Sequence, residues 1–270
     1  MIEDLKTLYT GKATIIKEKQ YLSAKAYVQP FIERMETYKA KFICEAKQAD
    51  QLSYDGNNID TVYNKVLVTA VLPSDYDFTV SYTEPNLFST QDITSKTYHR
   101  VVCMSYALDV KTPVCKFYTG VVDGDMNFYA FGKDCISIQE IETETPIDFS
   151  PLTTIVKNGI NDVCNKMLAQ FKSIKFNSED IYKMLGEWID FTITKDYSSD
   201  FGKVKLSSSM AIEAYKRIAI DKDSEYYSDA KQRNINDLYR AWSSQIEQDD
   251  KDIINRYEKT QLINRLFKLC

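Results

Sequence analysis

The spacing of apolar residues divides the chain into a helical beginning, a β-rich middle and a helical end. Near the beginning, Phe31, Met35, Tyr38 and Phe42 follow one another at intervals of four, three and four residues. These intervals place the four side chains on one side of a helix, and Pro30 suits a first helical position. We therefore predict a helix that begins at Pro30 and continues past Phe42.

The middle of the chain has the pattern of β-strands. Apolar, β-branched runs alternate with short connections that contain glycine or proline. Because short connections join antiparallel neighbours, the pattern predicts a β-meander. Residues 83–97 are rich in Ser and Thr and predict a surface loop. Strands are expected at residues 62–72, 98–110, 114–122, 126–131 and 135–141, with a short one at 78–82.

Helical spacing returns after residue 150, with helices expected at 151–174, 178–191, 208–220, 234–246 and 250–269. The order of elements predicts an α+β fold, in which a central antiparallel meander of about five strands is packed by N-terminal and C-terminal helices. The N-terminal helical segment (1–48), the β-sheet region (49–148) and the C-terminal helical region (149–270) are expected to form one composite domain.

The composition limits the kinds of catalytic and ligand-binding site that the chain can form. The 270 residues include one histidine, His99, and 8 glycines. Histidine is the usual base near neutral pH and the commonest metal ligand, and glycine-rich turns let backbone amides approach phosphates. We therefore expect a protein that works by binding, with no catalytic residues, no metal and no cofactor.

The charge is uneven: residues 49–150 carry 15 acidic and 6 basic residues, against a net charge of −5 for the whole chain. An acidic middle argues against a broad phosphate-binding surface. The six cysteines include no C-x-x-C pair, which favours reduced, structural thiols over a disulfide framework. Cys103, Cys115 and Cys135 are expected to be buried. The chain shows no signal peptide and no membrane-spanning run, so we expect a protein of the cytoplasm with no membrane partner.

Three short motifs resemble chemical sites. Glu45-Ala46-Lys47 has the spacing of a metal-dependent nuclease, but its expected place at a helix end would point the two side chains apart. Asp75 and Asp77 could offer two carboxylates, although a polar turn explains them better. His99 begins an expected strand, and the sequence names no nucleophile or orienting acid for it, so we expect a structural role.

The hairpin over residues 114–131 supplies the candidate binding site. If Asp123-Gly124 forms a two-residue type I′ turn, Phe117 and Val121 face the core. The opposite face then combines aromatic, amide and cationic groups, a composition that can stack bases or bind an amphipathic partner. The alternative is that C-terminal helices cover this face. Its residues, the nucleic-acid-binding candidates, are Lys116, Tyr118, Asn127, Tyr129 and Phe131.

Two stretches carry a family resemblance: the strand Arg100-Val-Val-Cys-Met-Ser105, and the helical segment Leu238-Tyr-Arg-Ala-Trp-Ser243. They resemble an uncharacterised family of proteins encoded by phages and plasmids, common in mobile elements of Bacteroidales. Arg240 stands where that family usually has asparagine. The resemblance implies a mobile-element context and no particular reaction.

These observations favour a non-enzymatic phage or mobile-element protein that assists DNA transactions by binding single-stranded DNA. The alternative is a virion structural or assembly component, or an adaptor that binds a host or phage protein. Either would act in the cytoplasm of a bacterial host or in the virion. An enzyme that uses clustered carboxylates is the least supported class.

Overall fold

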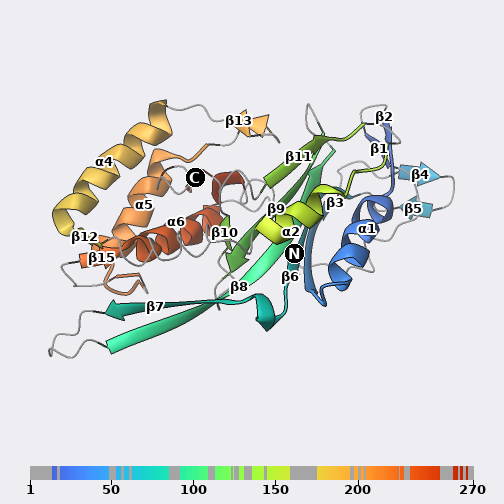
Figure 1. Ribbon diagram of the computed structural model, residues 1–270. Coiled ribbons are helices and arrows are strands. Elements are labelled where there is room, and N and C mark those ends of the chain that lie inside the picture. Colours follow the sequence, from blue (N-terminus) through green and yellow to red (C-terminus); the bar gives the residue numbers. More distant parts are fainter. Residues whose placement is uncertain are drawn as a thin grey trace.

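A twisted antiparallel sheet forms the centre of the molecule, as the computed structural model shows (Figure 1). Its hydrogen-bonded path runs β10-β9-β8-β6-β3, while β7 also pairs with β8 and β11 also pairs with β9. The strands are β3 (Lys41–Gln48), β6 (Tyr63–Val71), β7 (Phe78–Glu84), β8 (Asp92–Ala107), β9 (Val114–Val122), β10 (Phe128–Ala130) and β11 (Ile136–Glu140).

Helices surround the sheet, and the predicted α+β class is confirmed. They are α1 (Ala24–Glu36), α2 (Pro151–Asn158), α4 (Ser178–Thr194), α5 (Ser208–Ala219) and α6 (Ile235–Asp249), with a 3₁₀ turn, η2 (Ser74–Tyr76). Small two-stranded pairs complete the fold: β1 (Thr14–Ile16) with β2 (Lys19–Tyr21), β4 (Ser53–Asp55) with β5 (Asn58–Asp60), β12 (Lys175–Asn177) with β15 (Gln232–Asn234), and β13 (Ser198–Ser199) with β14 (Gly202–Lys203).

The structure describes only part of the chain. The described residues are 14–16, 19–48, 53–55, 58–60, 63–84, 92–108, 113–122, 124, 128–130, 136–142, 145–158, 175–194, 198–199, 202–203, 205–224, 226–227, 232–249, 258–260, 262–263 and 266. The predicted helices at 178–191, 208–220 and 234–246 are confirmed as α4, α5 and α6. Much of the predicted helices at 151–174 and 250–269 lies outside the described residues.

The first helix differs from the prediction at both ends. It begins earlier, where the Ser23 hydroxyl accepts a hydrogen bond from the Ala26 amide, and Pro30 lies inside it on the exposed side. It ends at Glu36, after which Lys39 adopts a φ of 59° and the Ala40 amide donates to the Met35 carbonyl. This left-handed turn reverses the chain, so residues 41–48 form β3 instead of continuing the helix. Within residues 41–47 every second residue is apolar, and this pattern is compatible with a strand as well as with the continued helix that was predicted.

The sheet also departs from a simple meander. β10 and β11 both pair antiparallel with β9, Ala130 opposite Gly120 and Ile136 opposite Tyr118. The two strands therefore follow the same edge of β9 in the same direction, and no hairpin joins them. At the other side, β8 begins at Asp92 and pairs with β7 over its first seven residues. Much of the loop predicted at 83–97 is therefore strand, because cross-strand hydrogen bonds stabilise even a polar segment.

The main core lies between α1, α2 and one face of the sheet. Phe31 of α1 stacks on Phe117 of β9 with ring centroids 6.3 Å apart, and Tyr27 lies 5.3 Å from Tyr106. Arg100 of β8 is buried and donates to the carbonyls of Ile155 and Val156 in the last turn of α2. A cation at the C-terminal end of a helix satisfies its unpaired carbonyls, so Arg100 fastens α2 to the sheet.

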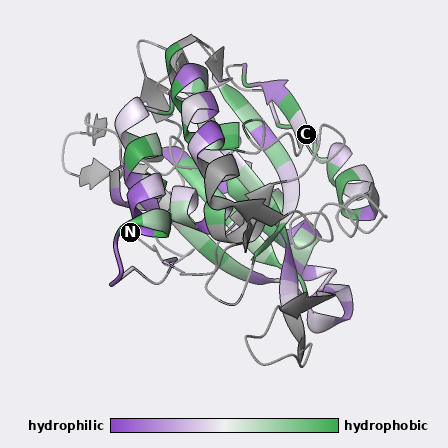
Figure 2. Cartoon of the chain, turned by 90° about the vertical axis from the view of Figure 1, so that its left-hand side faces the viewer, coloured by the Kyte–Doolittle hydropathy of each residue, from purple (hydrophilic) through white to green (hydrophobic). Residues whose placement is uncertain are grey.

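A second core joins α4, α5 and α6. Trp188 of α4 and Trp242 of α6 meet edge to face at its centre, with ring centroids 5.2 Å apart, and Tyr98 and Val121 connect the cluster to the sheet. Leu238, Tyr239 and Trp242 are fully buried and form the inner face of α6. Figure 2 shows strands that are mostly hydrophobic behind helices on which hydrophobic and hydrophilic residues alternate.

Candidate functional site

The hairpin proposed as a binding site has a different register from the predicted one. Val122 pairs with Phe128 and Gly120 with Ala130, so residues 123–127 form a five-residue connection in place of a two-residue turn. Gly124 is exposed there, a Cβ added to it would meet nothing within 4 Å, and its φ is not in the left-handed region. The two-residue type I′ turn predicted at Asp123-Gly124, which needs a positive φ at the glycine, is therefore wrong.

The face that was to bind nucleic acid is buried where the structure describes it. Every residue of β9 is buried, so both sides of the strand are covered. Phe117 and Val121 face the core as predicted, but Tyr118 is fully buried too and packs with Val101, Cys103 and Val122. Tyr118 therefore presents no ring for base stacking. Tyr129 lies in β10 without a described side chain, and Asn127 and Phe131 lie outside the described residues.

Lys116, the proposed phosphate ligand, forms a buried ion pair. Its Nζ lies 2.6 Å from Oε1 of Glu258, and the two side chains are 6% and 4% exposed. Glu258 comes from the C-terminal part of the chain, so the pair ties that part to the sheet. A buried amine held by a carboxylate is not available to phosphate, because exchanging partners would leave the carboxylate charged and unpaired. The alternative that C-terminal residues cover this face is therefore correct for Lys116.

The cysteines of the sheet are structural. Cys44, Cys103 and Cys115 are buried thiols outside any disulfide, which confirms the prediction for Cys103 and Cys115. The Cys103 thiol donates to Thr69 Oγ1 at 3.6 Å, and burial raises its pKa to about 12. Burial also raises the pKa of Cys115. Neither thiol supplies a nucleophile near neutral pH, because the thiolate is the reactive form. Cys135 lies outside the described residues.

His99 has an acidic partner that the sequence did not indicate. Its Nδ1 lies 3.1 Å from Oδ2 of Asp77, the residue that links η2 to β7, and its side chain is 41% exposed. Such a pair supplies two of the three groups of a nucleophilic triad. Within the described part of the chain, no hydroxyl or thiol is hydrogen-bonded to the imidazole. The pair therefore fixes the turn before β7, in keeping with the structural role expected of His99.

The Glu45-Ala46-Lys47 motif lies on a strand, not at a helix end. β3 is an edge strand, and positions 45 and 47 share one face of it. The reason given for rejecting a nuclease site was therefore wrong, yet the required second acid is missing from the neighbouring strand, where Leu67 and Lys65 stand opposite. No group of three or more His, Cys, Asp or Glu residues within the described ranges could hold a metal ion.

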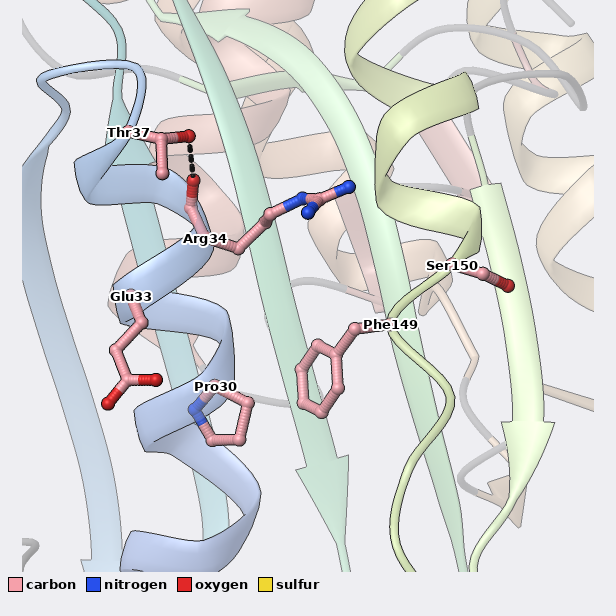
Figure 3. Close-up of a pocket in the computed structure, with 6 residues that line it drawn as sticks. All are labelled: Pro30, Glu33, Arg34, Thr37, Phe149 and Ser150. Atoms are coloured by element: carbon pink, nitrogen blue, oxygen red, sulfur yellow. Dashed lines mark hydrogen bonds between the residues drawn. The ribbon is translucent and has the colours of Figure 1, made fainter.

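An open groove of about 460 Å³ lies between α1 and the start of α2 (Figure 3). Its walls come from Pro30, Glu33, Arg34 and Thr37 on one side and Phe149 and Ser150 on the other. The Arg34 guanidinium reaches across it and donates to Thr153 Oγ1 at 2.6 Å. Asp148 accepts hydrogen bonds from the amide and hydroxyl of Ser150, which lower its pKa. Glu33 lines the groove together with Arg34, and its carboxylate disfavours an anion there. The groove therefore joins two helices, and its lining indicates no ligand.

The helical pair α4 and α5 presents a different kind of surface. Five large apolar side chains are exposed among the described residues, and four of them, Tyr182, Ile193, Ile212 and Ile220, belong to α4, α5 and the residue that ends α5. Tyr182 is 65% exposed and Ile193 70% exposed. We call these four residues the α4–α5 surface. Isolated exposed apolar residues are ordinary, and these four are notable because they lie on one pair of helices.

The two helices hold this surface rigidly. They pack antiparallel: Thr192 Oγ1 lies 2.8 Å from Ser208 Oγ at one end, and the rings of Tyr182 and Tyr215 lie 5.7 Å apart at the other. Trp188 packs the inner face of α4 into the second core, and Met210, Ala214 and Ile218 pack the inner face of α5 into the same core. The exposed side chains thus stand on helices that are fixed by their buried faces, which lowers the entropy cost of binding.

No protein-family model matches this sequence, and no curated protein or solved structure is significantly similar to it. No helix in the described ranges is long and apolar enough to cross a membrane.

Sequence reasoning missed the α4–α5 surface, although a signal was present. Within residues 178–194, apolar residues occupy much more than one stripe of the helix, at positions 181, 182, 184, 185, 188, 189, 191 and 193. A surface helix that is apolar on more than its inner face needs a second partner. The prediction gave a helix over residues 178–191 and assigned no function to its apolar positions.

Proposed function

We propose that this protein acts without catalysis, by binding another protein through the α4–α5 surface. The observation that supports this proposal is the concentration of exposed apolar side chains on α4 and α5, against a single one, Ile138, elsewhere in the described residues. Aromatic and branched apolar side chains on a rigid support are the usual centre of a protein–protein interface.

The proposal corresponds to an assembly component or an adaptor. The mobile-element context comes from the sequence resemblance and remains part of the proposal. Single-stranded DNA binding is the weaker hypothesis, because the two described candidates with known surroundings, Lys116 and Tyr118, are buried. The acidic balance of residues 49–150 also opposes a phosphate-binding surface.

A photo-reactive phenylalanine analogue at position 182 tests the proposal. The full chain carrying it is expressed in Bacteroidales cells, the host that the resemblance implies, irradiated and analysed by mass spectrometry. We expect one dominant cross-linked protein. The matched control carries the analogue at position 157, an exposed residue of α2, and should give none. No cross-link from position 182, or the same products from both positions, would refute the proposal.

Mobility shifts with single-stranded and double-stranded DNA supply the second arm. The proposal expects no salt-resistant shift with either probe. A shift that survives moderate salt, together with no cross-link from position 182, would restore the DNA-binding hypothesis at residues outside the described ranges.

A further inference from the structure

We draw no further inference here: the strongest candidate, the outer edge of the two-stranded ribbon that β7 and the first seven residues of β8 extend beyond the main sheet (Figure 1), carries none because nothing in the described part of the chain shows what covers it.

Discussion

Two regions of the molecule differ in how far they bury their apolar side chains. One is the sheet with its two covering helices, α1 and α2, and the other is the helical pair α4 and α5. Around the sheet, apolar side chains are buried from both directions: every residue of β9 is buried, and even Lys116 and Arg100 are enclosed. On α4 and α5 the inner faces are buried around Trp188, while Tyr182, Ile193 and Ile212 remain in solvent. The first region buries its apolar surface, and the second leaves part of it exposed to solvent.

The largest expected effect concerns the buried ion pair. Glu258→Ala leaves the Lys116 ammonium buried without its carboxylate, which should lower the free energy of unfolding by about 3–5 kcal/mol. Urea denaturation measures this change, with Glu36→Ala as the exposed control. The double variant Lys116→Met/Glu258→Leu should recover most of the loss, since both charges are removed together. A single variant as stable as the native protein would show that the pair is solvated.

A core truncation sharpens the contrast between the two regions. Phe31→Ala removes a fully buried ring that stacks on Phe117 and should cost about 3–5 kcal/mol. Tyr182→Ala removes a ring of similar size from the α4–α5 surface and should cost far less. The two unfolding free energies are compared in the same denaturant. Equal losses would mean that Tyr182 belongs to the core.

Alkaline pH should destabilise the sheet through its buried thiols and phenols. Burial raises the pKa of Cys103 to about 12 from an ordinary value of 9, so between these values the unfolded chain releases a proton that the folded chain retains. Stability is therefore undiminished below pH 9 and falls as the pH rises toward 12, by up to about 1.4 kcal/mol per unit for this group. Cys103→Ala should flatten the dependence measured by urea unfolding at pH 8 and pH 10.5. An unchanged slope would contradict the assignment.

The smallest expected effect is local. Lys39 holds a φ of 59° after α1, a conformation that costs little for glycine and more for other residues. Lys39→Gly should therefore raise the free energy of unfolding by about 0.5–1 kcal/mol. Lys41→Gly, in the strand that follows, should lower it instead. If both changes destabilise the protein, the turn after α1 has been misassigned.

The fold class and most of the helices followed from the sequence, because helical spacing over α4, α5 and α6 has few alternatives. The helix-to-strand change after Glu36 did not, since Phe42 continues the helical interval and also alternates correctly for β3. The register of the β9–β10 hairpin failed for a related reason. Asp-Gly is a strong turn signal locally, but pairing of Val122 with Phe128 and burial of Tyr118 are decided by contacts with distant parts of the chain.

The prediction of the binding site on the hairpin also failed because contacts with distant parts of the chain decide which residues are covered. An alternating strand shows which residues share a face, but not whether another segment covers that face. Glu258 lies 142 residues from Lys116 in the sequence, and the residues around each of them do not predict their ion pair. The α4–α5 surface could have been predicted more easily, because the excess of apolar positions on α4 is a local property of the sequence.

The α4–α5 surface is proposed to serve binding and not stability. The most direct measurement introduces Ile193→Lys and Ile212→Lys together into the chain that carries the photo-reactive residue at position 182. We expect a free energy of unfolding within about 1 kcal/mol of the unmodified chain, because both side chains are already exposed, and loss of the cross-linked product. A variant that unfolds several kcal/mol more easily, or that cross-links as before, would contradict the claim.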